Sequence, residues 1–251
     1  MQAASHPRIR VGIGGWTYEP WRGTFYPADL PQRRELEYAS RKLTSIEING
    51  TYYGSQKPES FRKWRDEAPD GFVFSVKGPR FATNRRVLAE AGESIDRFFA
   101  SGVTELGDKL GPVNWQLPAT KRFDAADFDA FLKLLPKEVG GVALRHVVEL
   151  RHDSFMVPEC VDLLRAHDVA VVLTDHATYP NFAESPASFI YARLQQASED
   201  EALGYSSDAL DGFAKRAEAW SDRGRRDVFI YMINGFKPKA PAAAMALIER
   251  L

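Results

Sequence analysis

Residues 45–77, SIEINGTYYGSQKPESFRKWRDEAPDGFVFSVK, contain one complete strand–helix–strand unit. In its two ends, 45–49 and 72–77, apolar side chains recur at every second position, which is typical of a strand that buries one face. The middle, 58–67, opens with a proline, whose missing N–H is tolerated in the first turn of a helix. Because the helix must return the chain to the same edge of the sheet, this unit predicts two parallel strands.

The same alternation of strand and helix runs through the whole chain. Strand patterns occupy eight runs: 10–14, 45–49, 72–77, 113–117, 147–151, 170–175, 189–195 and 228–234. Helical patterns lie between and after them, at 31–42, 58–67, 93–110, 125–135, 158–167, 207–223 and 239–251. Only a loop is predicted over 181–188. We therefore expect an α/β fold in which residues 1–251 form a single (β/α)8 TIM barrel of eight parallel strands.

A doubly wound open sheet is the alternative fold. Such sheets commonly carry a glycine-rich phosphate fingerprint, and GIGGW at 12–16 does not match GxGxxG. The length of 251 residues and a hydrophobic content of 44% suit a one-domain barrel. These features favour the barrel.

Composition limits the partners and the compartment. The formal net charge of -1 gives the chain as a whole no attraction for nucleic acid or for an anionic membrane. Neither a transmembrane helix nor a signal peptide is predicted, since long apolar runs are missing. The single cysteine, Cys160, excludes an intrachain disulfide and fits a reducing compartment. We expect a cytoplasmic protein without a membrane partner.

One face of the predicted strands is unusually polar. Side chains alternate faces along a strand, so one set packs under the helices and the other fills the barrel. The inward set contains Glu47, Asn49, Ser75, Lys77, Asn114, Gln116, Glu149, Arg151, Arg193 and Gln195, and two further strands end in Asp175 and Asn234. Barrels of this type carry their active sites at the carboxyl ends of the strands, where these residues concentrate. The alternative is a neutral ionic core, in which Glu47, Glu149 and Asp175 balance Lys77, Arg151 and Arg193.

Aromatic residues cluster in the loops that follow the first two strands. Trp16 and Tyr18 lie in the first loop, and Tyr53 follows the second strand. Their rings are suited to stacking on a sugar or a nucleobase, and the alternative is that they pack the loops onto the barrel rim. If the alternation of the first strand continues to Trp16, its side chain points into the barrel, which favours contact with a ligand.

Several motifs together resemble the YecE-like family, a domain-of-unknown-function family (number seventy-two). They are GIGGWTYEPWRGTFYP, TSIEINGTYYGSQ, FVFSVKGPRFAT, LGPVNWQLP, VVELRHDSF and VFIYMING. The resemblance implies a TIM barrel with a distant likeness to endonuclease IV and xylose isomerase, and it implies no established reaction. The family pattern falls on Trp16, Tyr18, Glu47, Asn49, Tyr53, Lys77, Gln116, Glu149, Arg151, His152, Asp175, Arg193 and Asn234. The chain departs from it at Asn84 and Gln195, where the family tends to have histidines.

The favoured function is a metal-independent acid–base enzyme, a hydrolase or lyase, that uses no cofactor. Its partner is a small anionic ligand or a phosphate-containing substrate that carries a sugar or a nucleotide. The catalytic candidates are Glu149, Glu47 and Asp175, and burial is expected to raise the pKa of the acting glutamate toward neutrality. The substrate-binding candidates are Trp16, Tyr18, Asn49, Tyr53, Lys77, Gln116, Arg151, His152, Arg193 and Asn234. We expect Glu149→Gln to keep the fold and abolish turnover.

Two other functions stay open. A metal-dependent hydrolase resembling endonuclease IV would draw its ligands from Glu149, His152, Asp175 and His176, although neighbouring cations would repel the metal. A barrel that binds nucleic acid or a metabolite without chemistry would use the rim aromatics and the basic segment at 77–86, KGPRFATNRR. Nucleic acid is a less favoured partner than a small anion, because charged runs are usually only solvated.

Overall fold

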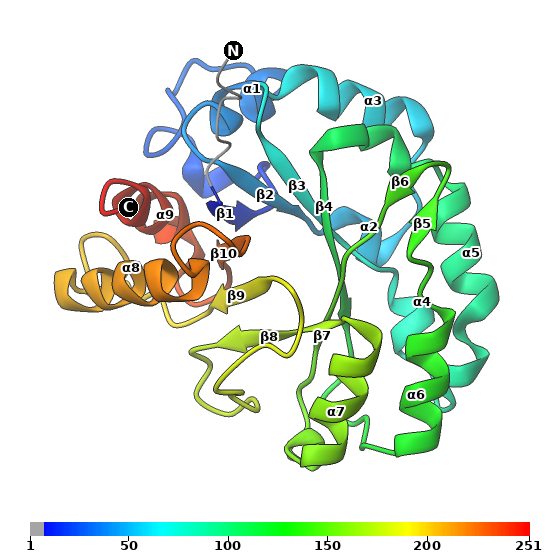
Figure 1. The fold of residues 1–251 in the computed structure, drawn as a ribbon. Coiled ribbons are helices and arrows are strands. Elements are labelled where there is room, and N and C mark those ends of the chain that lie inside the picture. The colour runs from blue at the N-terminus through cyan, green and yellow to red at the C-terminus, as the bar shows by residue number, and fades with distance from the viewer. Residues whose placement is uncertain (1–7) are drawn as a thin grey trace.

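The computed structural model describes residues 8–251, and eight parallel strands close into a barrel (Figure 1). The strand order around the barrel is β1-β10-β9-β8-β7-β4-β3-β2. The strands are β1 (Ile9–Gly14), β2 (Ser45–Ile48), β3 (Val73–Lys77), β4 (Leu110–Gln116), β7 (His146–Glu149), β8 (Ala170–Thr174), β9 (Ile190–Leu194) and β10 (Val228–Met232). The predicted TIM barrel is confirmed and the open sheet is wrong. Residues 1–7 of the predicted domain lie outside the described residues.

Helices surround the barrel on its outer face (Figure 1). They are α1 (Glu35–Ser40), α3 (Pro58–Glu67), α5 (Gly92–Ala100), α6 (Ala125–Leu134), α7 (Pro158–His167), α8 (Ser207–Ser221) and α9 (Ala240–Ile248). Two short helices, α2 (Gly50–Tyr53) and α4 (Arg80–Thr83), directly follow β2 and β3. Among the helices of the described chain, none combines the length and the apolar character needed to cross a bilayer.

Three details differ from the sequence prediction. The helix predicted over 93–110 is divided into α5 and a 3-10 segment, Val103–Lys109, because Gly102 between them has a φ of 96°. A short hairpin, β5 (Glu138–Val139) and β6 (Val142–Ala143), was not predicted. Further 3-10 turns span Glu19–Trp21, Gln32–Arg34, Leu88–Ala91, Asp153–Phe155 and Lys237–Lys239. The loop predicted over 181–188 is confirmed.

The predicted alternation of strand faces is confirmed. Outward side chains such as Ile46, Val76 and Trp115 belong to the large core beneath the helices. A separate apolar cluster fills the barrel and consists of Val73, Val147, Ala170, Val172, Ala187, Phe189, Tyr191, Phe229, Tyr231 and Ile233. The hydroxyls of Tyr191 and Tyr231 lie 2.7 Å from the hydroxyls of Ser75 and Ser45, respectively. Tyr191 also donates to Glu47, so this tyrosine connects the apolar interior to the polar network above it.

Candidate functional site

Six of the predicted site residues meet at the carboxyl ends of the strands. We call them the mouth cluster, and they are Glu47, Lys77, Gln116, Glu149, Arg151 and Arg193. All except Arg151 are buried. Their hydrogen bonds link β2, β3, β4, β7 and β9, so five strands of the barrel fix one network. The alternation of side chains along the predicted strands had placed these residues inside the barrel, and the structure agrees.

Glu149 is held between two guanidinium groups. Its Oε1 accepts hydrogen bonds from Nε and Nη2 of Arg151, at 2.8 and 2.6 Å, and its Oε2 accepts one from Nη1 of Arg193. Burial acts to raise the pKa of this carboxyl, but Arg193, Arg151 and Lys77 outweigh it and lower the pKa to about 2. The expectation that burial raises the pKa of Glu149 toward neutrality is therefore wrong. Glu149 is an ionised partner of the two arginines rather than a base poised near neutral pH.

Glu47 lies beneath Arg193 and has no exposed surface. Its Oε1 accepts a hydrogen bond from Nη2 of Arg193 at 3.2 Å. Its Oε2 accepts one from the Tyr191 hydroxyl at 2.5 Å and one from the amide of Asn114 at 3.2 Å. Three protein groups thus donate hydrogen bonds to this carboxylate, and the arrangement orients Arg193.

Lys77 lies beside Gln116 and Tyr52. Its ammonium donates to the Gln116 side-chain carbonyl and lies 4.6 Å from the centre of the Tyr52 ring. Burial and the nearby Arg193 lower the pKa of Lys77 to about 8. The next residue, Gly78, packs against Trp115, where a Cβ would lie 2.4 Å from the indole. A glycine at this point fixes the course of the chain just after Lys77.

Asp175 does not belong to the mouth cluster. Its Oδ1 accepts a hydrogen bond from the backbone N–H of Gln195 at 2.6 Å, and its Oδ2 accepts one from the Tyr205 hydroxyl at 3.0 Å. The cluster therefore contains three basic side chains, Lys77, Arg151 and Arg193, but only two carboxylates, Glu47 and Glu149. The alternative of a neutral core, with three acids balancing three bases, is therefore wrong, because Asp175 binds residues that follow β9 instead.

An aromatic recess lies on the same end of the barrel, beside β1 and β2. This cavity of about 350 Å³ is lined by Trp16, Asn49, Gln56, Trp64 and Lys237, together with backbone and small side chains. The rings of Trp16 and Trp64 meet edge to face, with centroids 5.2 Å apart. The side-chain carbonyl of Asn49 is buried and has no hydrogen-bond partner among the described residues. The recess thus offers apolar ring surface, and a buried acceptor without a partner belongs to one of its lining residues.

Lys237 was missed by the sequence reasoning. Its ammonium lies 4.3 Å from the centre of the Tyr18 ring, and burial lowers its pKa. Tyr18 itself packs edge to face on Trp21, with centroids 5.2 Å apart. Lys237 lies in a 3-10 turn beyond β10. The alternation of side chains along a strand gives no information on a residue beyond the end of that strand. The one feature of the sequence that could have indicated Lys237 is its position shortly after the last strand.

Three other candidates lie outside the mouth cluster. Tyr53 is 66% exposed and stands edge-on to Tyr52. His152 caps a 3-10 turn, since its Nδ1 accepts a hydrogen bond from the Ser154 N–H at 3.0 Å. Asn234 has a φ of 65° and donates to the side chain of Gln195 at 2.8 Å. Within residues 8–251, none of the three forms a hydrogen bond with a residue of the mouth cluster.

The ligand set considered for a metal does not converge. Both oxygens of Glu149 accept from guanidinium groups, Asp175 accepts from Gln195 and Tyr205, and His152 caps a turn. Within residues 8–251, no group of three or more His, Cys, Asp or Glu side chains is arranged to hold a metal ion. These residues as placed do not fit a metal site of the kind the likeness to endonuclease IV suggested.

A closed parallel barrel with a charged cluster at the carboxyl ends of its strands defines the class: a TIM barrel with a candidate ligand site at the usual end. A family model described as "Protein of unknown function DUF72" matches residues 10–251, and the chain belongs to that family. UPF0759 protein YecE of Escherichia coli (strain K12) is 28% identical over 150 residues, which make up 59% of this chain and 50% of YecE. The chain therefore spans about half the length of the curated relatives it matches.

Solved structures agree with the fold. A DUF72 family protein from Thermotoga maritima has a TM-score of 0.77 and 22% identity, with 96% of this chain and 98% of that chain covered. SacUVDE has a TM-score of 0.58 and 13% identity, with 97% and 100% covered. At these identities the two likenesses support the barrel fold alone.

Proposed function

We propose that the mouth cluster binds the anionic group of a small substrate. Lys77 then donates a proton to the substrate, or accepts one from it, in a metal-independent hydrolase or lyase reaction. The observation that carries this proposal is the charge of the cluster. Three basic groups face two carboxylates in a largely buried network, which leaves one positive charge without a partner. A bound phosphate or carboxylate would balance that charge, and the pairing would offset the cost of moving the anion out of water.

Arg151 is the group best placed to receive the anion. It is the least buried member of the cluster, and its Nη1 makes no hydrogen bond within the described chain. Its Nε and Nη2 are fixed by Glu149 and Gln116, so the guanidinium plane is held in place before the ligand arrives. A preorganised arginine fork suits the planar or tetrahedral oxygens of carboxylates and phosphates.

Lys77 is the candidate acid or base. A pKa of about 8 lets Lys77 exchange a proton near neutral pH, whereas Glu149 is held in its ionised form. Glu47 lies fully buried beneath Arg193, away from the mouth. The aromatic recess, which is lined by Trp16 and Trp64, suits the sugar or ring portion of the same substrate. A single cysteine fits our expectation that the reaction takes place in the cytoplasm.

Titration calorimetry with inorganic phosphate tests the binding part of the proposal. Arg151→Gln should weaken phosphate binding by roughly tenfold or more, since a charge-assisted fork is lost. Arg33→Gln, which removes an exposed arginine elsewhere, should leave affinity unchanged. Lys77→Gln serves as the second variant if Arg151→Gln unfolds. Full affinity in a folded Arg151→Gln or Lys77→Gln protein would refute the anion site.

A further inference from the structure

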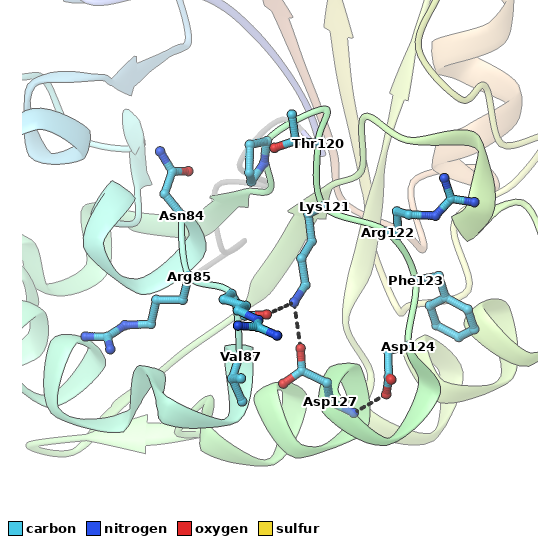
Figure 2. Close-up of a pocket in the computed structure, with 11 residues that line it drawn as sticks. Asn84, Arg85, Val87, Thr120, Lys121, Arg122, Phe123, Asp124 and Asp127 are labelled. Atoms are coloured by element: carbon cyan, nitrogen blue, oxygen red, sulfur yellow. Dashed lines mark hydrogen bonds and ion pairs between the residues drawn. The ribbon is translucent and has the colours of Figure 1, made fainter.

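A groove of about 940 Å³ lies outside the mouth cluster, between the segments that follow β3 and β4 (Figure 2). It is lined by Asn84, Arg85, Arg86, Val87, Pro118, Thr120, Lys121, Arg122, Phe123, Asp124 and Asp127. Four of these side chains are basic and two are acidic. The groove therefore has a positive excess, although the whole chain has a formal net charge of -1.

The positive excess resides in the arginines. Lys121 donates to Asp127 and to the Arg86 backbone carbonyl, each at 2.7 Å, so it fastens the two walls of the groove together (Figure 2). Asp124 caps α6 by accepting from the Asp127 N–H. Arg86 and Arg122 are exposed, and within residues 8–251 neither forms an ion pair or a side-chain hydrogen bond. These two cations are available to an anionic ligand.

Arg85 is anchored beside them. Its Nε donates to the Phe81 carbonyl at 2.8 Å and its Nη2 donates to the Ser94 hydroxyl at 2.9 Å. In Figure 2, Arg85 and Arg122 project on opposite sides of the groove. The walls are thus built by internal contacts, while part of their charge stays unpaired.

Two exposed aromatic rings lie on the neighbouring segments. Tyr53, at the end of α2, is 66% exposed, and Phe81, in α4, is 60% exposed. The Arg80 guanidinium lies 5.4 Å from the centre of the Phe81 ring. Because β2, β3 and β4 are adjacent in the barrel, rings and arginines follow one another along one side of the rim. We call Tyr53, Phe81, Arg86 and Arg122 the rim track.

We propose that the rim track binds single-stranded nucleic acid, with bases stacked on Tyr53 and Phe81 and phosphates at Arg86 and Arg122. Unpaired cations alone would suit any polyanion, but exposed rings next to cations are suited to unpaired bases. A duplex hides the faces of its bases and so gains nothing from the rings. This interaction goes beyond the proposed chemistry at the mouth and does not require it.

Fluorescence anisotropy with a labelled oligothymidylate of about fifteen nucleotides tests the proposal. The full chain should bind it at low salt, bind a duplex of equal length several-fold more weakly, and lose affinity steeply as salt rises. Arg86→Gln/Arg122→Gln should weaken binding by roughly tenfold and lower the salt slope by about 1.4, since each phosphate contact to a single strand contributes about 0.7. Phe81→Ala should weaken binding by roughly tenfold with little change in slope.

The control variant Arg33→Gln/Lys215→Gln removes the same charge from two exposed positions on other elements and should bind like the parent chain. The double arginine variant should also keep phosphate affinity at the mouth, which separates failure of this inference from failure of the proposed function. Absence of binding at low salt would overturn it. The inference would also be overturned if the duplex bound as tightly as the single strand, or if polyglutamate competed as well as an unlabelled oligonucleotide. An affinity loss in the control variant as large as in the double arginine variant would overturn it too.

Discussion

At the level of single residues, the surroundings of Glu149 decide its role. A buried carboxylate between two guanidinium groups is stabilised in its charged form, so its proton is lost far below neutral pH. Parity indicated that Glu149 points inward, but parity does not reveal which groups meet it there. The sequence therefore predicts the position of this residue correctly and its pKa in the wrong direction.

Glu149→Gln should destabilise the protein instead of leaving the fold unchanged. The amide cannot balance Arg151 and Arg193, and an uncompensated buried charge costs about 3 to 5 kcal/mol. Urea denaturation measures the loss, with Glu184→Gln in an exposed loop as the matched control. A Glu149→Gln protein as stable as that control would show that the pairing contributes little.

Lys77 makes anion binding dependent on pH. Burial and Arg193 lower its pKa to about 8, so the cluster has its extra positive charge below that pH and loses it above. Sulfate keeps a constant charge in this range, and its affinity should fall through about pH 8. Calorimetry across this range checks the effect. In Lys77→Gln the pH dependence of sulfate affinity should disappear. If the affinity of that variant still falls with the same midpoint, another group is responsible for the pH dependence.

At the level of elements, strands were predicted better than short helices. A strand with one buried face repeats every second residue, so all eight were found within a few residues. The four-residue helices α2 and α4 are too short to show a helical period. They carry Tyr53 and Phe81. The sequence had indicated the rim aromatics and the basic segment 77–86 as a possible nucleic-acid surface, but it did not indicate that Arg122 belongs with them.

The division of the predicted helix at 93–110 gives a prediction of its own. Gly102 has a φ of 96°, and a Cβ there would lie 2.8 Å from the side chain of Pro58. Gly102→Ala should therefore destabilise the protein by more than about 1 kcal/mol. Gly212→Ala, inside α8 with open space around it, should instead stabilise by up to about 1 kcal/mol. Thermal unfolding distinguishes the two, and equal effects would contradict the explanation.

At the level of the whole molecule, charge is distributed unevenly. A formal net charge near zero argued against polyanionic partners, yet the barrel mouth and the rim groove each hold more basic than acidic groups. The fold and the inward residues of the mouth were predictable, because barrel closure brings the strand ends together. The sequence did not predict that Asp175 lies outside the mouth cluster, or that Lys237 and Arg122 line cavities, because contacts between loops determine these positions.

The central claim is that an anion completes the mouth cluster. Crystals grown or soaked with selenate, a sulfate analogue with an anomalous signal, test it most directly. We predict an anomalous peak within hydrogen-bond distance of Arg151 and near Lys77, and its loss in Arg151→Gln. An empty mouth at a selenate concentration that fills other surface sites, or a metal ion bound to Glu149, would contradict it.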